Sequence, residues 1–535
     1  MSKRSQQIEA LFQQGQRCHT TGRLAQAETI YRQVIAAAPR HADALHALGA
    51  LALQAGHPDA AETLIGQAIA LKPAADFHLT RAHAWLALCR PRDAARACRA
   101  VLRARPDSAA AHQILGHALC DDNQPKAAIE AYRQALRLQP SLPDIRNNLG
   151  TALRQAHRLA EAEAELRQAP PDSGVLANLS SVQKERGAFN EAEATLRQAL
   201  SLAPNGPILR YNWSLLMLLL DRAAEAWSGW EQRFRAGAVL PLSFTQPQWT
   251  GDDLNGRTLL VHAEQGLGDV IQFCRYLPAI RGRVIFQAPA KLIRLLSSNP
   301  AMPPMLPLTD PPASPPPTPP PDSQPAGAFE TVPATQADLA VPLLSLPARM
   351  AEPPVSPPYL FPEAERAALW RDRIGPSGLR VGIAWQGFSD RQEDSGRSIP
   401  LAAFQPLATI RWVRLISLQK GEGEAQVAAV SFAVETLPGL DGGADAFIDT
   451  AAIMPTLDLV VTSDTSVAHL AGALGCPVWV ALRRVPDWRW MLDRSDSPWY
   501  PSMRLFRQTQ DDDWAPVFAA IAAALRQLDR PGDAA

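Results

Sequence analysis

The stretch GHALCDDNQPKAAIEAYRQALRLQP, residues 116–140, decides the fold of the first half of the chain. It begins with Gly116 and ends with Pro140, and both residues recur at nearly constant spacing. Glycines at 15, 49, 116 and 150 are separated by 34, 67 and 34 residues, and prolines at 39, 73, 106 and 140 by 34, 33 and 34. A period near 34 residues is typical of a helical solenoid, in which each repeat buries its apolar face against its neighbours.

Each repeat also carries a small residue four positions before an apolar or aromatic one. Small residues allow two helices to approach closely, and a proline lacks the N–H that would continue a helix. The arrangement resembles the tetratricopeptide repeat. Two looser units follow, so we expect about seven repeats over residues 1–236. The alanines that mark the seven units are Ala27, Ala61, Ala94, Ala128, Ala162, Ala192 and Ala226.

The resemblance implies stacked helix pairs with a concave face that binds a protein or peptide partner. The alternative is that the array only holds or dimerises whatever follows it. The chain carries 52 Lys and Arg against 53 Asp and Glu, a net charge of −1. Because it lacks a basic field, we expect no nucleic-acid partner.

The N-terminal residues indicate a cytoplasmic protein. The sequence MSKRSQQIEALFQQ lacks the apolar run of about 7 to 15 residues that a signal peptide needs. The longest apolar cluster, residues 213–220, is shorter than the roughly 20 residues of a membrane helix. Six cysteines without metal-ligand spacing predict reduced residues and no metal site.

After Trp249 the pattern changes to α/β. An apolar strand at 258–262 leads into the turn EQGLGD, residues 264–269, and a helical pattern follows at 270–280. Strand, glycine turn and helix open a nucleotide-binding α/β unit. Further strands are predicted at 284–287 and 337–344, with a helix near 289–298 between them. We therefore expect a first lobe over residues 250–360.

Proline accounts for 48 residues of the chain, and eight of the eleven residues 311–321 are proline. Proline cannot make ladder hydrogen bonds or helix interiors, so this segment predicts an exposed or disordered loop. Strand patterns occur on both sides of it. We therefore expect an insertion inside the first lobe, at about 300–336, with the lobe junction near 353–378.

A second lobe is predicted over residues 378–530. Strands are expected at 379–385, 412–418, 457–461 and 477–482, and helices at 401–408, 449–455 and 465–474. Alternating short strands and helices imply a parallel sheet covered on both faces. Ligands of such sheets bind at the carboxyl ends of the strands.

One strand end of the second lobe is rich in groups that could bind a diphosphate. Free amides and hydroxyls converge where a buried strand meets the start of a helix, and His469 lies one turn further in. The alternative is plain helix capping by Ser463 or Asp464. The hydroxyl and carboxyl groups belong to Ser463, Asp464, Thr465 and Ser466.

The stretch SDTSVAHLAGALGCPVWVAL, residues 463–482, resembles the nucleotide-sugar motif of bacterial heptosyltransferases, which are GT-B glycosyltransferases. EQGLGD resembles that family's N-terminal Gly-Asp turn. The resemblance implies two Rossmann-like lobes, with Asp269 as the base that deprotonates the acceptor hydroxyl. Glu264, on the same turn, competes for that role, and helix capping is the alternative for Asp269. Gln265 and Gly268 of the turn are expected near the cleft.

The leaving group of such a reaction is a nucleotide diphosphate, which needs a metal or fixed donors. No Asp-x-Asp element stands at a strand end, so fixed donors are preferred. Arg397 matches a position where the heptosyltransferases tend to carry Lys, and Lys420 is a weaker candidate for which an ordinary surface role is the alternative. Trp385 and Arg489 are further cleft candidates, although tryptophans near Arg489 more often fill a core.

The sequence therefore predicts an α plus α/β chain, a repeat solenoid followed by a two-lobe GT-B module. The predicted activity is inverting, metal-independent transfer from a nucleotide-diphosphate sugar to an acceptor, probably a protein held by the repeats, and no cofactor is expected. The alternative is a repeat scaffold whose glycosyltransferase-like module has lost catalysis. The proline insertion motivates that alternative, since it interrupts the acceptor-side lobe.

Overall fold

The computed structural model describes residues 3–142, 144–239, 246–308, 337–350, 356–387 and 396–528. The chain forms two compact units, the first reaching Pro204 and the second beginning at Asn205. The proline-rich stretch 311–321 lies outside the described residues. No helix among the described residues is long and apolar enough to cross a membrane.

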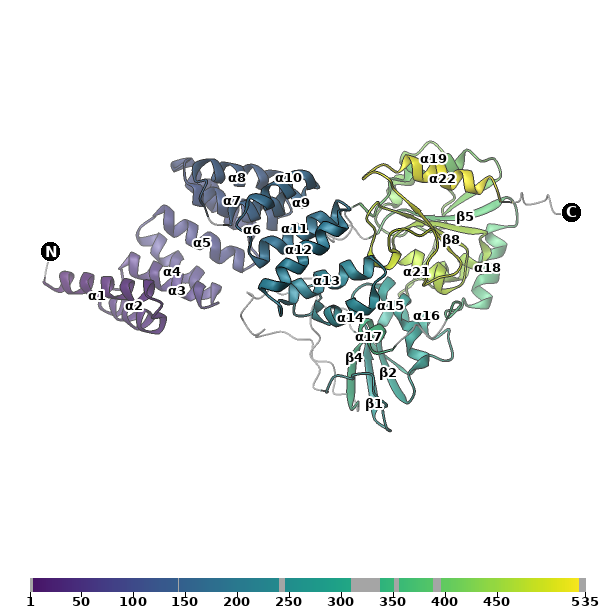
Figure 1. The fold of residues 1–535 in the computed structure, drawn as a ribbon, viewed down its shortest axis with the longest axis horizontal. Helices are drawn as coiled ribbons and strands as arrows, with labels where there is room; N and C mark the ends of the chain where they lie inside the picture. Colours follow the sequence, from purple (N-terminus) through teal and green to yellow (C-terminus); the bar gives the residue numbers. More distant parts are fainter. Residues whose placement is uncertain are drawn as a thin grey trace. The chain divides into compact units, whose positions relative to one another are not determined.

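The first unit consists of consecutive antiparallel helix pairs (Figure 1). Each pair packs its first helix against its second, and the second against the first helix of the next pair. The repeat solenoid predicted from the 34-residue period is therefore confirmed. Its helices are α1 Lys3–Thr20, α2 Leu24–Ala37, α3 Ala42–Gln54, α4 Pro58–Leu71, α5 Ala75–Ala87, α6 Pro91–Ala104, α7 Ala109–Asp121, α8 Pro125–Leu138, α9 Ile145–Gln155, α10 Leu159–Gln168, α11 Ser173–Glu185 and α12 Phe189–Leu202.

The periodic glycines lie where the two helices of a pair cross. A Cβ on Gly116 would be 2.5 Å from the Tyr132 ring, and one on Gly150 would be 2.6 Å from the Leu166 side chain. Only a residue without a side chain allows this approach. The second helix of each of the first four pairs ends two residues before its proline, as the missing proline N–H predicts.

The seventh helix pair belongs to the second compact unit rather than to the first. Its helices are α13 Pro207–Leu219 and α14 Ala223–Trp230, and the short 3₁₀ helix η1 Glu231–Arg233 follows directly. Ser214 of α13 donates a hydrogen bond to the Ala226 carbonyl at 2.7 Å, which holds the pair together. The last predicted repeat is thus built into the α/β part of the chain.

The first sheet is parallel, with the strand order β3-β2-β1-β4. The chain returns to this sheet after the proline-rich stretch, because β2 and β4 both pair with β1 (Figure 1). The strands are β1 Thr258–His262, β2 Arg283–Pro289, β3 Met305–Leu308 and β4 Leu339–Pro342, and the helices are α15 Leu267–Phe273, α16 Ile293–Leu296 and α17 Leu346–Arg349.

The second sheet is also parallel, with the order β6-β5-β7-β8-β9. Its strands are almost entirely buried, as expected for a sheet covered on both faces. The strands are β5 Leu379–Ala384, β6 Val413–Ser417, β7 Leu459–Ser463, β8 Val478–Leu482 and β9 Met503–Arg507. The helices are α18 Ala364–Ile374, α19 Gln405–Ala408, α20 Ile448–Ile453, α21 Ser466–Ala473 and α22 Ala515–Leu525.

Some predicted elements differ in extent. The helix expected at 270–280 begins at Leu267 as α15 and continues after Phe273 as the 3₁₀ helix η2 Cys274–Ala279, in which Pro278 lacks an amide donor. The helix expected at 289–298 is only α16 preceded by a 3₁₀ turn. The edge strands β3 and β9 were not predicted.

Candidate functional site

The candidate site lies where the turn after β1 meets the start of α21. Helix α15, which begins in this turn, packs against α21. A Cβ on Gly268 would lie 3.1 Å from Cδ2 of His469 and 3.3 Å from Cα of Ser466. The two stretches that the sequence singled out, one in each lobe, are therefore in contact at the carboxyl ends of β1 and β7.

Asp269 has both carboxylate oxygens engaged. Oδ2 accepts a hydrogen bond from the Gly266 backbone N–H at 2.9 Å, so the side chain caps the start of α15. Oδ1 accepts from Nη2 of Arg489, which belongs to the second lobe. The capping role considered for Asp269 is thus present together with an ion pair between the lobes.

Arg489 is buried and satisfied by three side chains. Besides Asp269, its Nη1 donates to Asp487 at 2.8 Å and its Nε donates to Gln272 at 2.8 Å. Its guanidinium lies 4.5 Å from the centre of the Trp488 ring. Burial lowers the pKa of Arg489, but the charges of Asp487 and Asp269 outweigh it and raise the pKa above the ordinary value.

The start of α21 carries no side-chain cap. Its N-cap residue is Thr465, whose side chain makes no capping bond, so capping by Ser463 or Asp464 is not what the structure shows. Ser463 is buried at the end of β7, and its hydroxyl has no hydrogen-bond partner among the described residues. The Thr465 hydroxyl lies 3.3 Å from that of Thr462.

Asp464 is half-buried beside charged groups of both signs. Burial, followed by the charge of Asp487, raises the pKa of Asp464, while Arg397 and Arg489 act in the opposite direction. Arg397 is therefore within electrostatic reach of the α21 start. Its Nε is buried without a hydrogen-bond partner in the described part of the chain. The structure brings Arg397 and Asp464 together as the sequence predicted.

His469 is buried between aromatic rings. Its Nδ1 lies 3.1 Å from the Tyr500 hydroxyl, and its ring stacks on Trp490 with centres 5.2 Å apart. Burial, reinforced by the charge of Arg489, lowers the pKa of His469 to about 3. The imidazole is therefore neutral at neutral pH.

Glu264 lies in a buried ion pair with Arg233. Nη2 and Nε of Arg233 donate to its two oxygens at 2.7 and 3.0 Å, and the Leu344 N–H donates at 3.1 Å. The Glu264 side chain is 2% exposed. Burial raises the pKa of Glu264 even though the Arg233 charge opposes this. This arrangement joins the seventh helix pair to the first lobe and leaves Glu264 away from solvent.

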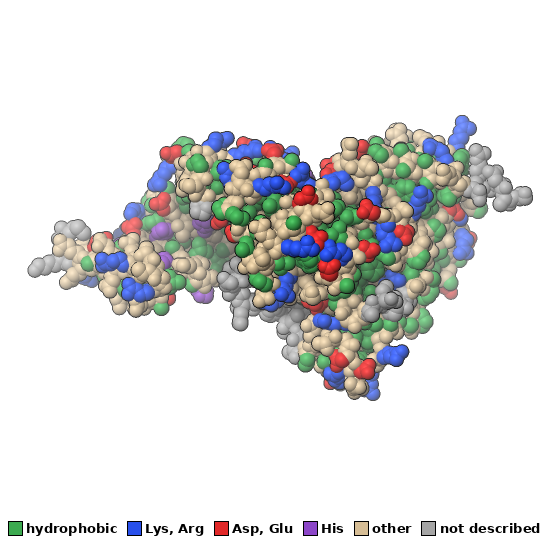
Figure 2. Space-filling model, in the orientation of Figure 1, with side chains coloured by type: hydrophobic (Ala, Val, Ile, Leu, Met, Phe, Trp, Pro, Cys, Tyr) green, Lys and Arg blue, Asp and Glu red, His purple; other side chains and the backbone are tan. Residues whose placement is uncertain are grey.

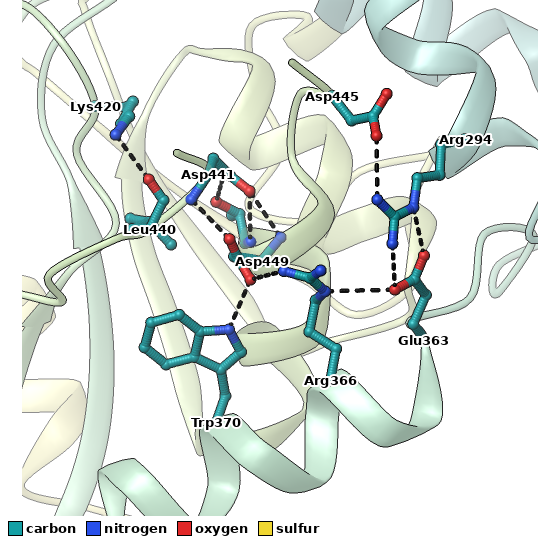
Figure 3. Close-up of polar contacts among 10 residues, drawn as sticks. Arg294, Glu363, Arg366, Trp370, Lys420, Leu440, Asp441, Asp445 and Asp449 are labelled. Carbon is teal, nitrogen blue, oxygen red and sulfur yellow. Dashed lines mark hydrogen bonds and ion pairs between the residues drawn. The ribbon is translucent and has the colours of Figure 1, made fainter. Parts of the chain in front are cut away.

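Lys420 lies in a different neighbourhood. It follows β6, and β5 separates β6 from β7 in the sheet. Its Nζ donates to the Leu440 carbonyl at 2.7 Å, next to the network formed by Asp441 and Asp449 (Figure 3). In that network Asp449 accepts from Trp370 at 2.9 Å.

Two further candidates are placed plainly. Trp385 is fully buried after β5 and packs against Phe404, so it belongs to the core of the second lobe. Gln265 is exposed on the turn, with a φ of 62°.

Several residues of the site were not singled out from the sequence. Asp487, Gln272 and Tyr500 each contact a predicted residue directly. Asp487 stands two positions before Arg489, and that local Asp-x-Arg spacing was the available signal. Gln272 and Tyr500 gave none, because their partners are distant in sequence. Among the described residues, no group of three or more His, Cys, Asp or Glu could hold a metal ion.

Comparisons with known proteins identify the first unit. Models of the tetratricopeptide repeat match residues 20–86 and 173–205, and a TPR repeat model matches residues 116–155. Together with the helix pairs, they show that the N-terminal region is an array of tetratricopeptide repeats. Such repeats indicate a protein-interaction scaffold.

The chain is 27% identical over 419 residues to Protein FlbA of Caulobacter vibrioides, covering 71% of this chain and 67% of that protein. A match of that length is longer than the repeat array, so it extends into the α/β part. Similar solved structures include Pseudomonas aeruginosa pilF, 18% identical, with a TM-score of 0.35 over 39% of this chain and 97% of that one. A tetratricopeptide repeat protein from Parabacteroides merdae is 15% identical, with a TM-score of 0.38 over 43% and 94% of the two chains.

Proposed function

We propose that the second unit is a GT-B glycosyltransferase that transfers a sugar from a nucleotide-diphosphate sugar to a protein held by the repeats. The observation that carries this proposal is the contact between the Gly268–Asp269 turn and the start of α21. Two parallel sheets thereby present the carboxyl ends of β1 and β7 to each other, where ligands of open α/β sheets bind. The resemblance of both stretches to heptosyltransferases supports the same reaction.

In the proposed reaction Asp269 is the base. A carboxylate oxygen has two lone pairs, so the oxygens that accept from Gly266 and Arg489 can each accept one further bond. An acceptor hydroxyl donates its proton to Asp269 while its oxygen attacks the anomeric carbon. The bond from that carbon to the diphosphate oxygen breaks, and its electron pair leaves with the nucleotide diphosphate. A single displacement of this kind inverts the configuration at the anomeric carbon.

The leaving diphosphate is proposed to bind at the uncapped start of α21. The first N–H groups of a helix, the Ser463 and Ser466 hydroxyls and the Arg397 guanidinium supply fixed donors there. Arg397 can bind two phosphate oxygens at once, which a Lys at this position cannot do in the same planar geometry. This assignment gives the buried Arg397 Nε a partner.

The proposal is tested with a panel of UDP, GDP, CDP and ADP sugars. We expect at least one donor to be hydrolysed or transferred and its nucleotide to raise the melting temperature. Failure of every donor in both measurements would count against the proposal. A mass-spectrometric search for partners that lose a sugar on gene deletion identifies the acceptor.

One observation favours the alternative of a repeat scaffold with an inactive module. Both oxygens of Asp269 are already bonded, one of them to a buried arginine. If this pair is purely structural, Arg489→Lys should lower thermal stability, and no donor in the panel should be turned over by the wild type. A wild type that turns over a donor removes this alternative.

A further inference from the structure

The seventh helix pair contacts both of the loops that carry the Asp269–Arg489 pair. On the first-lobe side, Arg233 of η1 bonds Glu264, which stands five residues before Asp269 on the same turn. Arg233 also donates to the Ser345 hydroxyl at 2.8 Å. On the same side, Trp230 donates from Nε1 to the Leu344 carbonyl at 2.9 Å. Helix α14 and η1 are thus fixed to the loop that follows β1 and to the residues that follow β4.

On the second-lobe side the contact runs through Trp488. This buried ring lies in the 3₁₀ helix η9, Trp488–Trp490, beside Arg489. Its centre is 5.4 Å from that of Trp230 and 6.3 Å from that of Trp227, both on α14. The opposite neighbour is Phe273 of α15, at 6.4 Å. Trp488 therefore fills the space between the seventh helix pair and the helix that begins with the Asp269 turn.

The orientation of Arg489 depends on this cluster. Its guanidinium lies over the Trp488 ring, at 4.5 Å, and also near Phe273, at 5.8 Å. A planar guanidinium stacked on an aromatic face has a fixed plane, and that plane directs its two N–H pairs. Moving Trp488 would turn Arg489 and shift the donor that Asp269 accepts.

We infer that α14 and η1 of the seventh repeat position the Asp269–Arg489 pair, with Trp488 and Arg233 as positioning residues. The inference rests on the proposed function for its catalytic consequence, but not for its structural one. It assigns the last repeat a part in the site itself, so that a partner held by the repeats acts on the same helix pair that sets the base. Neither Trp488 nor Arg233 needs to touch substrate.

The experiment compares full-length Trp488→Ala, Trp488→Phe and Trp227→Ala with wild type. Trp227 is half-buried at the edge of the cluster, so its variant guards against loss of folding. Trp370→Phe is the matched control, because Trp370 is a buried tryptophan that bonds Asp449 in another part of the second lobe. The first readout is hydrogen exchange of peptides covering residues 263–273, which requires no activity.

We expect exchange at 263–273 to rise in Trp488→Ala and Trp227→Ala, to return toward wild type in Trp488→Phe, and to be unchanged in Trp370→Phe. For the donor that the wild type turns over in the nucleotide-sugar panel, kcat should fall by about 10- to 100-fold in Trp488→Ala. KM should stay within about 2-fold, because no substrate contact is removed.

Unchanged exchange at 263–273 in both alanine variants would overturn the inference, as would an equal rise in the Trp370→Phe control. If the wild type turns over no donor, the proposed function fails, and the exchange measurement still decides the positioning role. A rise in KM without a change in kcat would also overturn it, since that would place Trp488 in substrate binding.

Discussion

Asp269 holds two structural bonds and is proposed to make a third during catalysis. The Gly266 N–H and the Arg489 guanidinium fix the direction of its carboxylate, and both favour the ionised form that a base requires. A fixed carboxylate needs no reorganisation when the acceptor hydroxyl arrives. The same bonds that hold the α15 start can therefore serve the chemistry.

Replacing Asp269 by Asn tests this directly. The amide keeps an oxygen for the Gly266 N–H but cannot take a proton, so we expect transfer to fall by about 10² to 10⁴-fold with nucleotide binding intact. Steady-state turnover and nucleotide affinity check it. Asp253→Asn, an exposed change in the same lobe, is the control and should leave both unchanged. Turnover by Asp269→Asn at the wild-type rate would remove Asp269 from the mechanism.

A second residue-scale prediction concerns His117 of the repeat array. Burial, followed by the charge of His83, lowers the pKa of His117 from 6.5 to about 4. Between pH 4 and 6.5 the unfolded chain therefore binds more protons than the folded one, and stability falls as the pH falls through this window. Several other array histidines are shifted the same way by burial, and in the view of Figure 2 histidines lie over the repeat helices.

His117→Gln should therefore reduce the pH dependence of stability. The slope of the free energy of unfolding between pH 5 and 6.5 should decrease by up to about 1.4 kcal/mol per pH unit, the value for one proton. Urea unfolding at several pH values measures this. Exposed His57→Gln serves as the comparison, and an identical slope in wild type and His117→Gln would contradict the prediction.

At the scale of elements, the crossing of two helices within a repeat depends on one missing side chain. A Cβ on Gly116 would lie within 2.5 to 2.8 Å of three atoms of the rigid Tyr132 ring. We expect Gly116→Ala to destabilise the array by about 1 to 3 kcal/mol, because overpacking exceeds the gain in helix propensity. Chemical denaturation followed by circular dichroism measures it.

Gly66→Ala is the matched control. Gly66 also lies in a repeat helix, but a Cβ there would meet only the end of the Arg81 side chain, at 3.5 Å. Helix propensity then acts alone, and stability should rise by about 0.5 to 1 kcal/mol. Equal effects of the two substitutions would show that the crossing is not as tight as these distances indicate.

The elements differ in how far sequence could predict them, for physical reasons. The repeat helices follow from a period that recurs along the chain, and β1 matches its predicted bounds because five apolar residues precede a glycine turn. The edge strand β3, with the sequence MLPL, is short, partly exposed and contains Pro307, so it lacks a strand pattern. Helix α22 is apolar nearly all round, and such a helix lacks the one-sided stripe by which amphipathic helices are found.

The site could be predicted only in part, for a related reason. Asp269 and the residues 463–466 stand at strand ends, where local sequence carries a signal. The partners that fix them come from other elements: Arg489 from the β8–β9 connection, and Arg233 from the repeat end. A buried ion pair between residues 31 positions apart, such as Arg233 and Glu264, leaves no periodic mark in the sequence.

At the scale of the whole molecule, the boundary between units does not coincide with the end of the repeats. The first unit ends at Pro204, whereas the helix-pair pattern continues to Trp230. The visible surface mixes acidic and basic side chains, in keeping with a net charge of −1 (Figure 2). The α/β part therefore includes a repeat of its own, held by apolar rings and one buried ion pair.

That ion pair makes the last prediction. Arg233 has no exposed side-chain surface and Glu264 is 2% exposed, so removing one partner leaves a buried charge unpaired. We expect Arg233→Met to destabilise the second unit by about 3 to 5 kcal/mol, and the double variant Arg233→Met with Glu264→Gln to recover much of that loss. Hydrogen exchange in increasing urea follows each unit separately. Peptides from residues 3–142 should keep wild-type protection, while peptides from residues 258–308 lose it at lower urea. Equal loss of protection in both sets would show that the repeats and the α/β part unfold as one, and would contradict a boundary at Pro204.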